Sequence, residues 1–133
     1  MQYVKLGNTG LDISRLCLGC MTFGEPDAGT HPWTLGEDAS RPIIRHAVEQ
    51  GINFFDTANG YGGQGHRGRT EEIVGRWFAK TGRRDEVVLA TKCYGSTLDE
   101  DVPNFSKLSA VNVRRSAIAS LRRLQTEHID LYQ

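Results

Sequence analysis

Short apolar runs alternate with amphipathic helical patterns along this chain, and this alternation constrains the fold more than any other feature. Strands are predicted at four apolar runs, residues 16–19, 52–56, 87–91 and 129–133. Helices are predicted in the segments between these runs, from about 37 to 50, 70 to 81 and 109 to 124. Such an order is typical of right-handed βαβ units, in which helices cover a parallel sheet. The predicted fold class is α/β.

Two further apolar runs, residues 3–6 and 11–13, precede the first of these strands. The sequence between them, Gly7-Asn8-Thr9-Gly10, consists of residues that favour a tight turn. The chain is therefore expected to open with a β-hairpin. The hairpin, four strands and three helices are fewer elements than the eight strands and eight helices of a closed (β/α)8 barrel.

Each predicted helix carries a stripe of apolar residues at helical spacing. The stripes are Ala39, Ile43, Ile44, Ala47 and Val48 in the first helix, Ile73, Val74, Trp77 and Phe78 in the second, and Val113, Ala117, Leu121 and Leu124 in the third. Pro42 is expected in the first turn of the first helix, where its missing N–H costs little. Ser109 is the predicted N-cap of the third helix.

Positive and negative side chains balance in this chain of 133 residues. Sixteen Lys and Arg oppose sixteen Asp and Glu, so no net field would attract nucleic acid or an anionic membrane. Four arginines are expected on a solvated face of the third helix, Arg114, Arg115, Arg122 and Arg123. No stretch approaches the ~20 apolar residues of a transmembrane helix, and the N-terminus lacks the apolar run of a signal peptide. We therefore expect a cytoplasmic protein without nucleic-acid or membrane partners.

The three cysteines, Cys17, Cys20 and Cys93, are an odd number, which suits reduced thiols better than a disulfide framework. Cys17 and Cys20 form a C-x2-C pattern, but no second Cys or His pair lies at the spacing of a zinc site. Because the surrounding residues read as an apolar strand, both thiols are expected to be small buried core residues. No metal site is predicted.

Three polar side chains follow the ends of the predicted strands. Asp56 ends one strand, Tyr61 lies five residues later in a Gly-flanked loop, and Lys92 ends the next strand. Because working residues in parallel α/β folds stand at the carboxyl ends of strands, we expect these three to surround one point. The ordinary alternative for each is a surface aromatic, a solvated lysine and an aspartate that caps a turn.

These residue types suit the reduction of a carbonyl by a nicotinamide, which needs hydride at carbon and a proton at the developing alkoxide. A tyrosine can supply the proton when an adjacent ammonium favours the phenolate form. Lys92 is the candidate ammonium for Tyr61, and Asp56 is the candidate carboxylate that keeps Lys92 charged. Trp33 either lines a substrate pocket or simply packs against its own loop.

Residues 63–68, Gly-Gln-Gly-His-Arg-Gly, fit the G-x-G-x-x-G pattern of dinucleotide-binding folds and precede a helix. The first glycine stands seven residues past Asp56, whereas the fingerprint requires it directly after the strand. We therefore interpret these glycines as a loop. His66, Arg67 and Arg69 are expected on a solvated edge or near the entrance for a ligand.

Five ordered blocks of the chain resemble the aldo-keto reductase family, namely residues 6–11, 18–24, 51–62, 88–92 and 120–133. The resemblance covers the whole chain. It implies that residues 1–133 are the N-terminal part of an NADP-dependent oxidoreductase domain, a partial (β/α)8 TIM barrel with the hairpin, the first four strands and three helices. It also implies NADP(H) as the cofactor and the reversible reduction of aldehydes or ketones to alcohols.

The resemblance also implies roles for individual residues. Tyr61 would be the general acid, Lys92 would tune it, and Asp56 would orient Lys92 and lie beside the nicotinamide. Gly19, Cys20 and Met21 resemble the family's first cofactor-contacting loop. The family's fourth catalytic residue is a histidine that usually lies two positions beyond a Leu-Tyr-Gln such as residues 131–133, so the chain is expected to be a fragment of the catalytic domain.

Two functions stay open. The first is a reductase of small carbonyl substrates, of which this chain holds part of the site. The second is a non-catalytic interaction or regulatory subunit, because the resembling family includes channel-associated β subunits of the same fold. Half a barrel leaves two sheet edges unpaired, which favours self-association through those edges.

Overall fold

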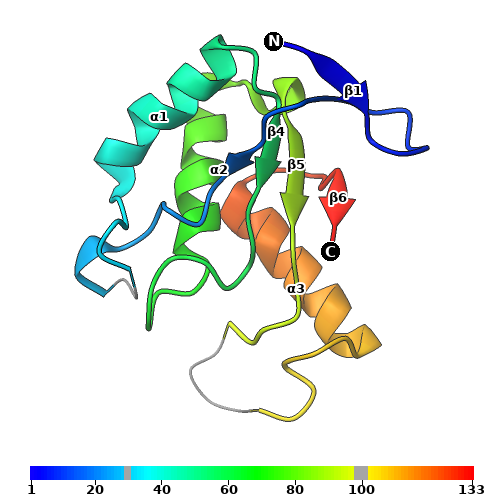
Figure 1. Ribbon diagram of the computed structural model, residues 1–133. Helices are drawn as coiled ribbons and strands as arrows, with labels where there is room; N and C mark the ends of the chain where they lie inside the picture. Colours follow the sequence, from blue (N-terminus) through cyan, green and yellow to red (C-terminus); the bar gives the residue numbers. More distant parts are fainter. Residues whose placement is uncertain (29–30, 98–101) are drawn as a thin grey trace.

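The computed structural model describes residues 1–28, 31–97 and 102–133, and it has one parallel sheet backed by three helices (Figure 1). The strands are β3 (Leu18–Gly19), β4 (Phe54–Asp56), β5 (Val88–Thr91) and β6 (Leu131–Tyr132), and they lie in the order β3-β4-β5-β6. The helices are α1 (Glu37–Glu49), α2 (Arg69–Thr81) and α3 (Ala110–Leu124). All neighbouring strands of this sheet are parallel, which confirms the predicted α/β class.

A separate hairpin precedes the sheet, as predicted. It consists of β1 (Tyr3–Lys5) and β2 (Asp12–Ser14), which pair antiparallel. Two short 3-10 helices, Pro26–Ala28 and Arg84–Glu86, lie in the connections. The two long connections predicted as loops include residues 29–30 and 98–101, which lie outside the described residues.

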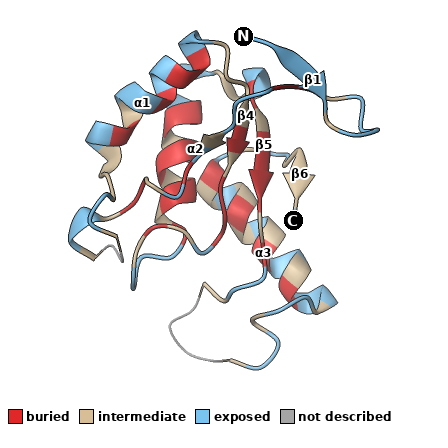
Figure 2. Cartoon of the chain, viewed as in Figure 1, coloured by how far each residue is buried: buried red, intermediate tan, exposed pale blue. Residues whose placement is uncertain are grey.

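The core lies between the sheet and α2. Phe55 of β4 and Leu89 of β5 have no exposed surface, and the predicted stripe of α2 is at most 4% exposed throughout. Figure 2 shows this buried layer as the red faces of β4, β5 and α2. Because α2 has the sheet on one side and a helix on each flank, its apolar stripe is covered from three directions.

Helix α1 begins near the predicted residue, but Pro42 lies deeper in it than predicted. Its first residue is Glu37, so Pro42 occupies the second turn rather than the first, and the prediction is wrong. Pro42 lies on the exposed side of the helix. The buried face consists of Ser40, Ile44, Ala47 and Val48, whereas Ala39 and Ile43 of the predicted stripe are exposed. Ile43 lies beside the outer edge of β3, where no described residue covers it.

The first parallel strand is shorter and less buried than predicted. Leu16 is 60% exposed, Cys17 is exposed, and β3 contains only Leu18 and Gly19. The reason is the position of β3 at the edge of the sheet, with β4 as its single strand neighbour among the described residues. The prediction of a buried thiol is wrong for Cys17, whereas Cys20 and Cys93 are buried, and all three thiols are free.

Helix α3 buries a different face from the predicted one. Asn112, Ser116, Ser120 and Leu124 are buried, so Leu124 alone of the predicted stripe is enclosed. Small side chains suit this face because α3 approaches α2 closely, and a Cβ on Gly75 would overlap the carbonyl oxygen of Arg123. The Ser109 cap is confirmed, since its hydroxyl accepts a hydrogen bond from the Asn112 backbone N–H at 3.2 Å.

The prediction that all four arginines of α3 are solvated is wrong for Arg123. Its Nε donates to Glu71 Oε2 at 2.7 Å, and the two side chains are 17% and 0% exposed. Glu71 Oε1 also accepts from the Thr91 hydroxyl at 2.6 Å. This buried contact therefore joins α2, α3 and β5 directly behind the strand end that carries Lys92.

Candidate active site

Asp56 and Lys92 meet at the carboxyl ends of neighbouring strands. Asp56 is the last residue of β4, Lys92 follows the last residue of β5, and the two strands pair in parallel. Lys92 Nζ lies 2.6 Å from Asp56 Oδ1 and donates a second hydrogen bond to the Thr57 carbonyl oxygen at 2.8 Å. The pair is partly exposed, at 30% and 35%, so it lies at the surface of the sheet end rather than in the core.

Tyr61 lies next to this pair. Lys92 Nζ is 5.2 Å from the centroid of the Tyr61 ring, within the range in which a cation is attracted to an aromatic face. The loop that carries the ring is held by its backbone, because the Tyr61 carbonyl accepts from Gly68 N–H at 2.9 Å and its N–H donates to the Ala58 carbonyl at 3.2 Å. The structure thus brings Asp56, Tyr61 and Lys92 together at one point.

The segment Gly19-Cys20-Met21 borders the same point from the other side. Gly19 is the register partner of Asp56, and Cys20 N–H donates to the Asp56 carbonyl oxygen at 2.9 Å. The Cys20 side chain is fully buried, and this burial raises the pKa of its thiol. Met21 is 46% exposed, and no atom lies within 4 Å of a Cβ built on Gly19. The exposed surface here is therefore the Gly19 backbone and the Met21 side chain.

A cavity of about 470 Å³ opens beside Tyr61. Its lining residues are Met21, His31, Thr34, Gly60, Tyr61, Gly62, Gly63, Gln64 and Arg67. Arg67, expected either on a solvated edge or near the entrance for a ligand, lines the cavity, whereas Trp33 does not line it. Trp33 stacks on His31 instead, with ring centroids 4.2 Å apart. His31 and Gln64 were not singled out from the sequence for this site, because no local pattern connects them to Tyr61.

Two further residues at the strand ends were also missed. Gln133 Nε2 donates to Asp56 Oδ1 at 3.3 Å, although the two residues are 77 positions apart. The Thr57 hydroxyl is buried and has no hydrogen-bond partner among the described residues. An unpaired buried hydroxyl beside Asp56 is consistent with a polar site, because such groups are usually satisfied elsewhere in a protein.

The described residues contain neither a metal-type cluster nor a membrane-type helix. Across residues 1–28, 31–97 and 102–133, no three His, Cys, Asp or Glu side chains are gathered as potential metal ligands. Within the same part of the chain, no helix combines the length and apolar character needed to cross a membrane.

Comparisons with known proteins agree with this fold and geometry. YrpG, an uncharacterized oxidoreductase of Bacillus subtilis, is 48% identical over 136 residues, which cover 100% of this chain and 39% of YrpG. Versiconal hemiacetal acetate reductase of Aspergillus parasiticus is 36% identical over 149 residues, with 100% of this chain and 41% of the reductase covered. This chain therefore spans about two fifths of the length of these relatives.

A solved structure shows the same similarity. The holo form of an aldo-keto reductase from Bacillus halodurans superposes with a TM-score of 0.79 at 34% identity, covering 100% of this chain and 39% of that one. The resemblance predicted from the five sequence blocks is confirmed. Since the profile of the Aldo/keto reductase family matches residues 15–133, this chain belongs to that family.

Proposed function

We propose that this chain forms part of an NADP(H)-dependent reductase of aldehydes and ketones, with Asp56, Tyr61 and Lys92 as its catalytic residues. The observation that carries the proposal is the contact of Lys92 Nζ with Asp56 Oδ1 at 2.6 Å, while the same ammonium lies 5.2 Å from the Tyr61 ring centroid. Membership of the aldo/keto reductase family supports oxidoreductase chemistry on carbonyls.

The proposed step is proton transfer from the Tyr61 hydroxyl to the carbonyl oxygen of a substrate in the adjoining cavity. This transfer leaves a phenolate, whose negative charge the nearby Lys92 ammonium stabilises. Asp56 holds the ammonium in place through their contact at 2.6 Å. A nicotinamide cofactor held beside Asp56 would, when bound, supply the hydride for the carbonyl carbon.

The residues that border Asp56 fit the nicotinamide end of the cofactor. Gly19, Cys20, Met21 and Asp56 would form its contacts. Gly19 leaves open space where a side chain would project, so a flat ring can approach its backbone, and the exposed Met21 offers an apolar flank. Cys20 would act through its backbone position, because its side chain is buried in the core.

We propose that the chain self-associates through the edges of its sheet. Strands β3 and β6 are the two edges of the described sheet. Beside β3 lies a groove of about 810 Å³, lined largely by apolar residues that include Leu16, Leu18 and Ile43. Unpaired strand edges next to exposed apolar side chains favour pairing with another chain. We expect sedimentation velocity to show a concentration-dependent dimer.

The test of the proposed chemistry measures NADPH binding and NADPH consumption separately. Binding is followed by the change in NADPH fluorescence, and turnover is followed by NADPH oxidation with 4-nitrobenzaldehyde. We expect Tyr61→Phe to lower turnover by about 10²–10⁴-fold, because it removes the proton donor, while NADPH still binds. The matched control is Tyr94→Phe, since Tyr94 is 65% exposed and should leave turnover unchanged.

Three outcomes would contradict the proposal. A wild-type chain that binds NADPH without any turnover would be a nucleotide-binding subunit rather than a reductase. A chain that neither binds nor consumes NADPH would point to the alternative, a non-catalytic interaction or regulatory subunit. Turnover that is equal in wild type and Tyr61→Phe would remove Tyr61 from its proposed role.

A further inference from the structure

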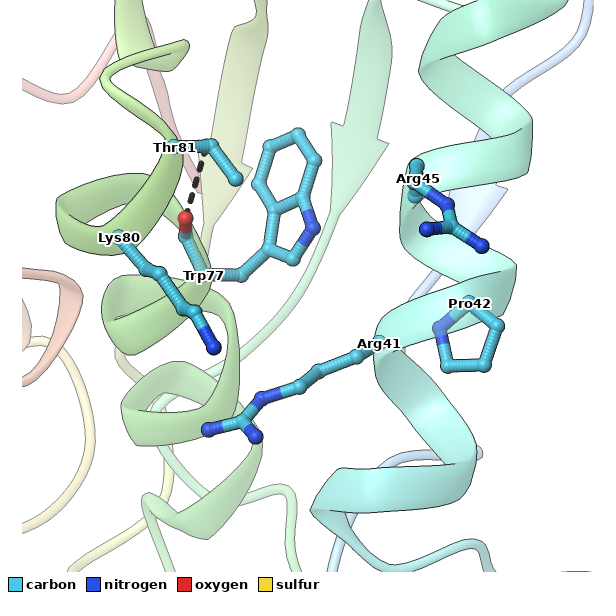
Figure 3. A pocket seen from close by; sticks show the side chains of 6 residues that line it. All are labelled: Arg41, Pro42, Arg45, Trp77, Lys80 and Thr81. Atoms are coloured by element: carbon cyan, nitrogen blue, oxygen red, sulfur yellow. Dashed lines mark hydrogen bonds between the residues drawn. The ribbon is translucent and has the colours of Figure 1, made fainter.

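A second cavity lies between α1 and α2, on the side of the helices that faces away from the sheet. Its volume is about 330 Å³. It is lined by Arg41, Pro42 and Arg45 from α1 and by Trp77, Lys80 and Thr81 from α2 (Figure 3). Both walls are helices of this chain, and none of the lining residues takes part in the proposed carbonyl chemistry.

Trp77 provides the wall of this cavity on the side of α2. Figure 3 shows its indole ring pointing from α2 toward α1. The residue is only 4% exposed, but its Nε1 atom retains some contact with solvent. This atom donates no hydrogen bond within the described residues. The indole N–H is therefore an accessible, unused donor at the cavity. Pro42 gives the opposite wall a compact apolar ring.

The three cations of the cavity differ in how far they are neutralised. Arg41 is held by Glu37 at 2.7 Å and by Asp38 at 3.3 Å. Arg45 has one loose contact, to Glu49 at 3.9 Å, between two side chains that are 65% and 52% exposed. Lys80 has no ion-pair partner among the described residues. Lys80 thus carries positive charge without a partner among the described residues, and Arg45 is only weakly paired.

We infer that this cavity binds a small organic anion, a carboxylate carried on a compact apolar ring. The carboxylate would contact Arg45 and Lys80, because these two cations are less tightly paired than Arg41, and the Trp77 N–H would be a third donor. The ring would lie between the indole of Trp77 and the ring of Pro42. The volume is near the lower end of ligand pockets, which run from about 300 to 1,000 Å³, so a single-ring ligand is the right size.

The experiment uses cyclohexanecarboxylate as the probe and Trp77 as the reporter. The sequence has two tryptophans, so a Trp33→Phe background leaves Trp77 as the only one. We expect a saturable change of Trp77 emission with a Kd on the order of 1 mM, because the cavity is open and the ligand is small. Lys80→Gln and Arg45→Gln should each weaken binding about two- to fivefold. High salt should weaken it further by screening.

Matched controls test separately whether binding needs the charge of the ligand, the ring of the ligand and the cations of this cavity. Arg114→Gln removes an exposed cation on α3 and should leave binding unchanged. Cyclohexanecarboxamide has the ring without the charge, and inorganic phosphate has charge without the ring, so both should bind more weakly. The inference is overturned if the carboxamide or phosphate binds as tightly as the carboxylate. It is equally overturned if Trp77 emission does not change, or if Lys80→Gln and Arg45→Gln bind as well as Arg114→Gln.

Discussion

Helix α2 is held to its two neighbouring helices in different ways. Toward α3, the contact is the buried pair of Glu71 and Arg123, 0% and 17% exposed, and the helices approach closely at Gly75. Toward α1, the contact is the pair of Arg76 and Glu37, 34% and 19% exposed, beside an open cavity. Water can replace a lost partner on the α1 side but not on the α3 side, so single substitutions should have unequal effects on the two sides.

Glu71→Ala should give the largest loss in the free energy of unfolding. The substitution leaves the Arg123 guanidinium buried without a counter-charge and removes the acceptor of the Thr91 hydroxyl. Breaking a buried pair by removing one partner costs about 3–5 kcal/mol, so the variant should be strongly destabilised or unfolded in urea titrations. Glu72→Ala is the control on the same helix, because Glu72 is 38% exposed and its ion pairs should contribute about 1 kcal/mol or less. Equal costs for the two variants would contradict the proposed difference.

Gly75→Ala should give an intermediate loss in the free energy of unfolding. A Cβ at Gly75 would overlap the backbone of Arg123 and Leu124, so α3 must move away from α2. Overpacking of this kind costs about 1–3 kcal/mol, although alanine by itself favours a helix more than glycine does. Gly95→Ala is the control, because no atom lies within 4 Å of its added Cβ. Should Gly75→Ala unfold at a higher urea concentration than wild type, the close approach would not be a constraint.

The order of elements could be predicted from the sequence because it depends on local patterns. The periodicity of apolar residues was enough to predict all three helices, and the turn residues were enough to predict the hairpin. The buried face of α2 was predicted correctly, whereas the buried faces of α1 and α3 were less predictable, since they depend on partners far away in the chain. Arg123 is buried because Glu71 lies against it, 52 positions earlier. Cys17 is exposed because β3 is at the sheet edge, which depends on strand order rather than on its neighbours in sequence.

The candidate site was predictable to a similar degree. The rule that polar residues gather at the carboxyl ends of parallel strands was enough to predict the proximity of Asp56, Tyr61 and Lys92. Gln133 and His31 carry no comparable signal, because their places at the site depend on strand pairing and on the path of a loop. The catalytic roles of the three residues remain the proposal that Tyr61→Phe tests.

The smallest expected effect is on the acid dependence of the free energy of unfolding. It arises from Glu37, in the contact between α1 and α2. Hydrogen bonds from Arg76, and next the charges of Arg76 and Arg41, hold the pKa of Glu37 below its ordinary value of 4.5. Because the folded pKa is lowered, the contribution of Glu37 to stability is fully present above about pH 4.5 and is lost as pH falls through the folded pKa. Glu37→Gln should therefore show a shallower loss of stability below this pH than wild type.

Urea titrations of wild type and Glu37→Gln across this pH range measure the difference in slope. At neutral pH the variant should lose less than about 1 kcal/mol, because the pair is partly exposed, and high salt should shrink that loss. The loss caused by Glu71→Ala should change little with salt, because a buried pair is screened much less. If salt changed the stability losses of Glu37→Gln and Glu71→Ala equally, solvent would reach both sides of α2 to the same extent. That result would contradict the proposed difference between the α1 and α3 contacts.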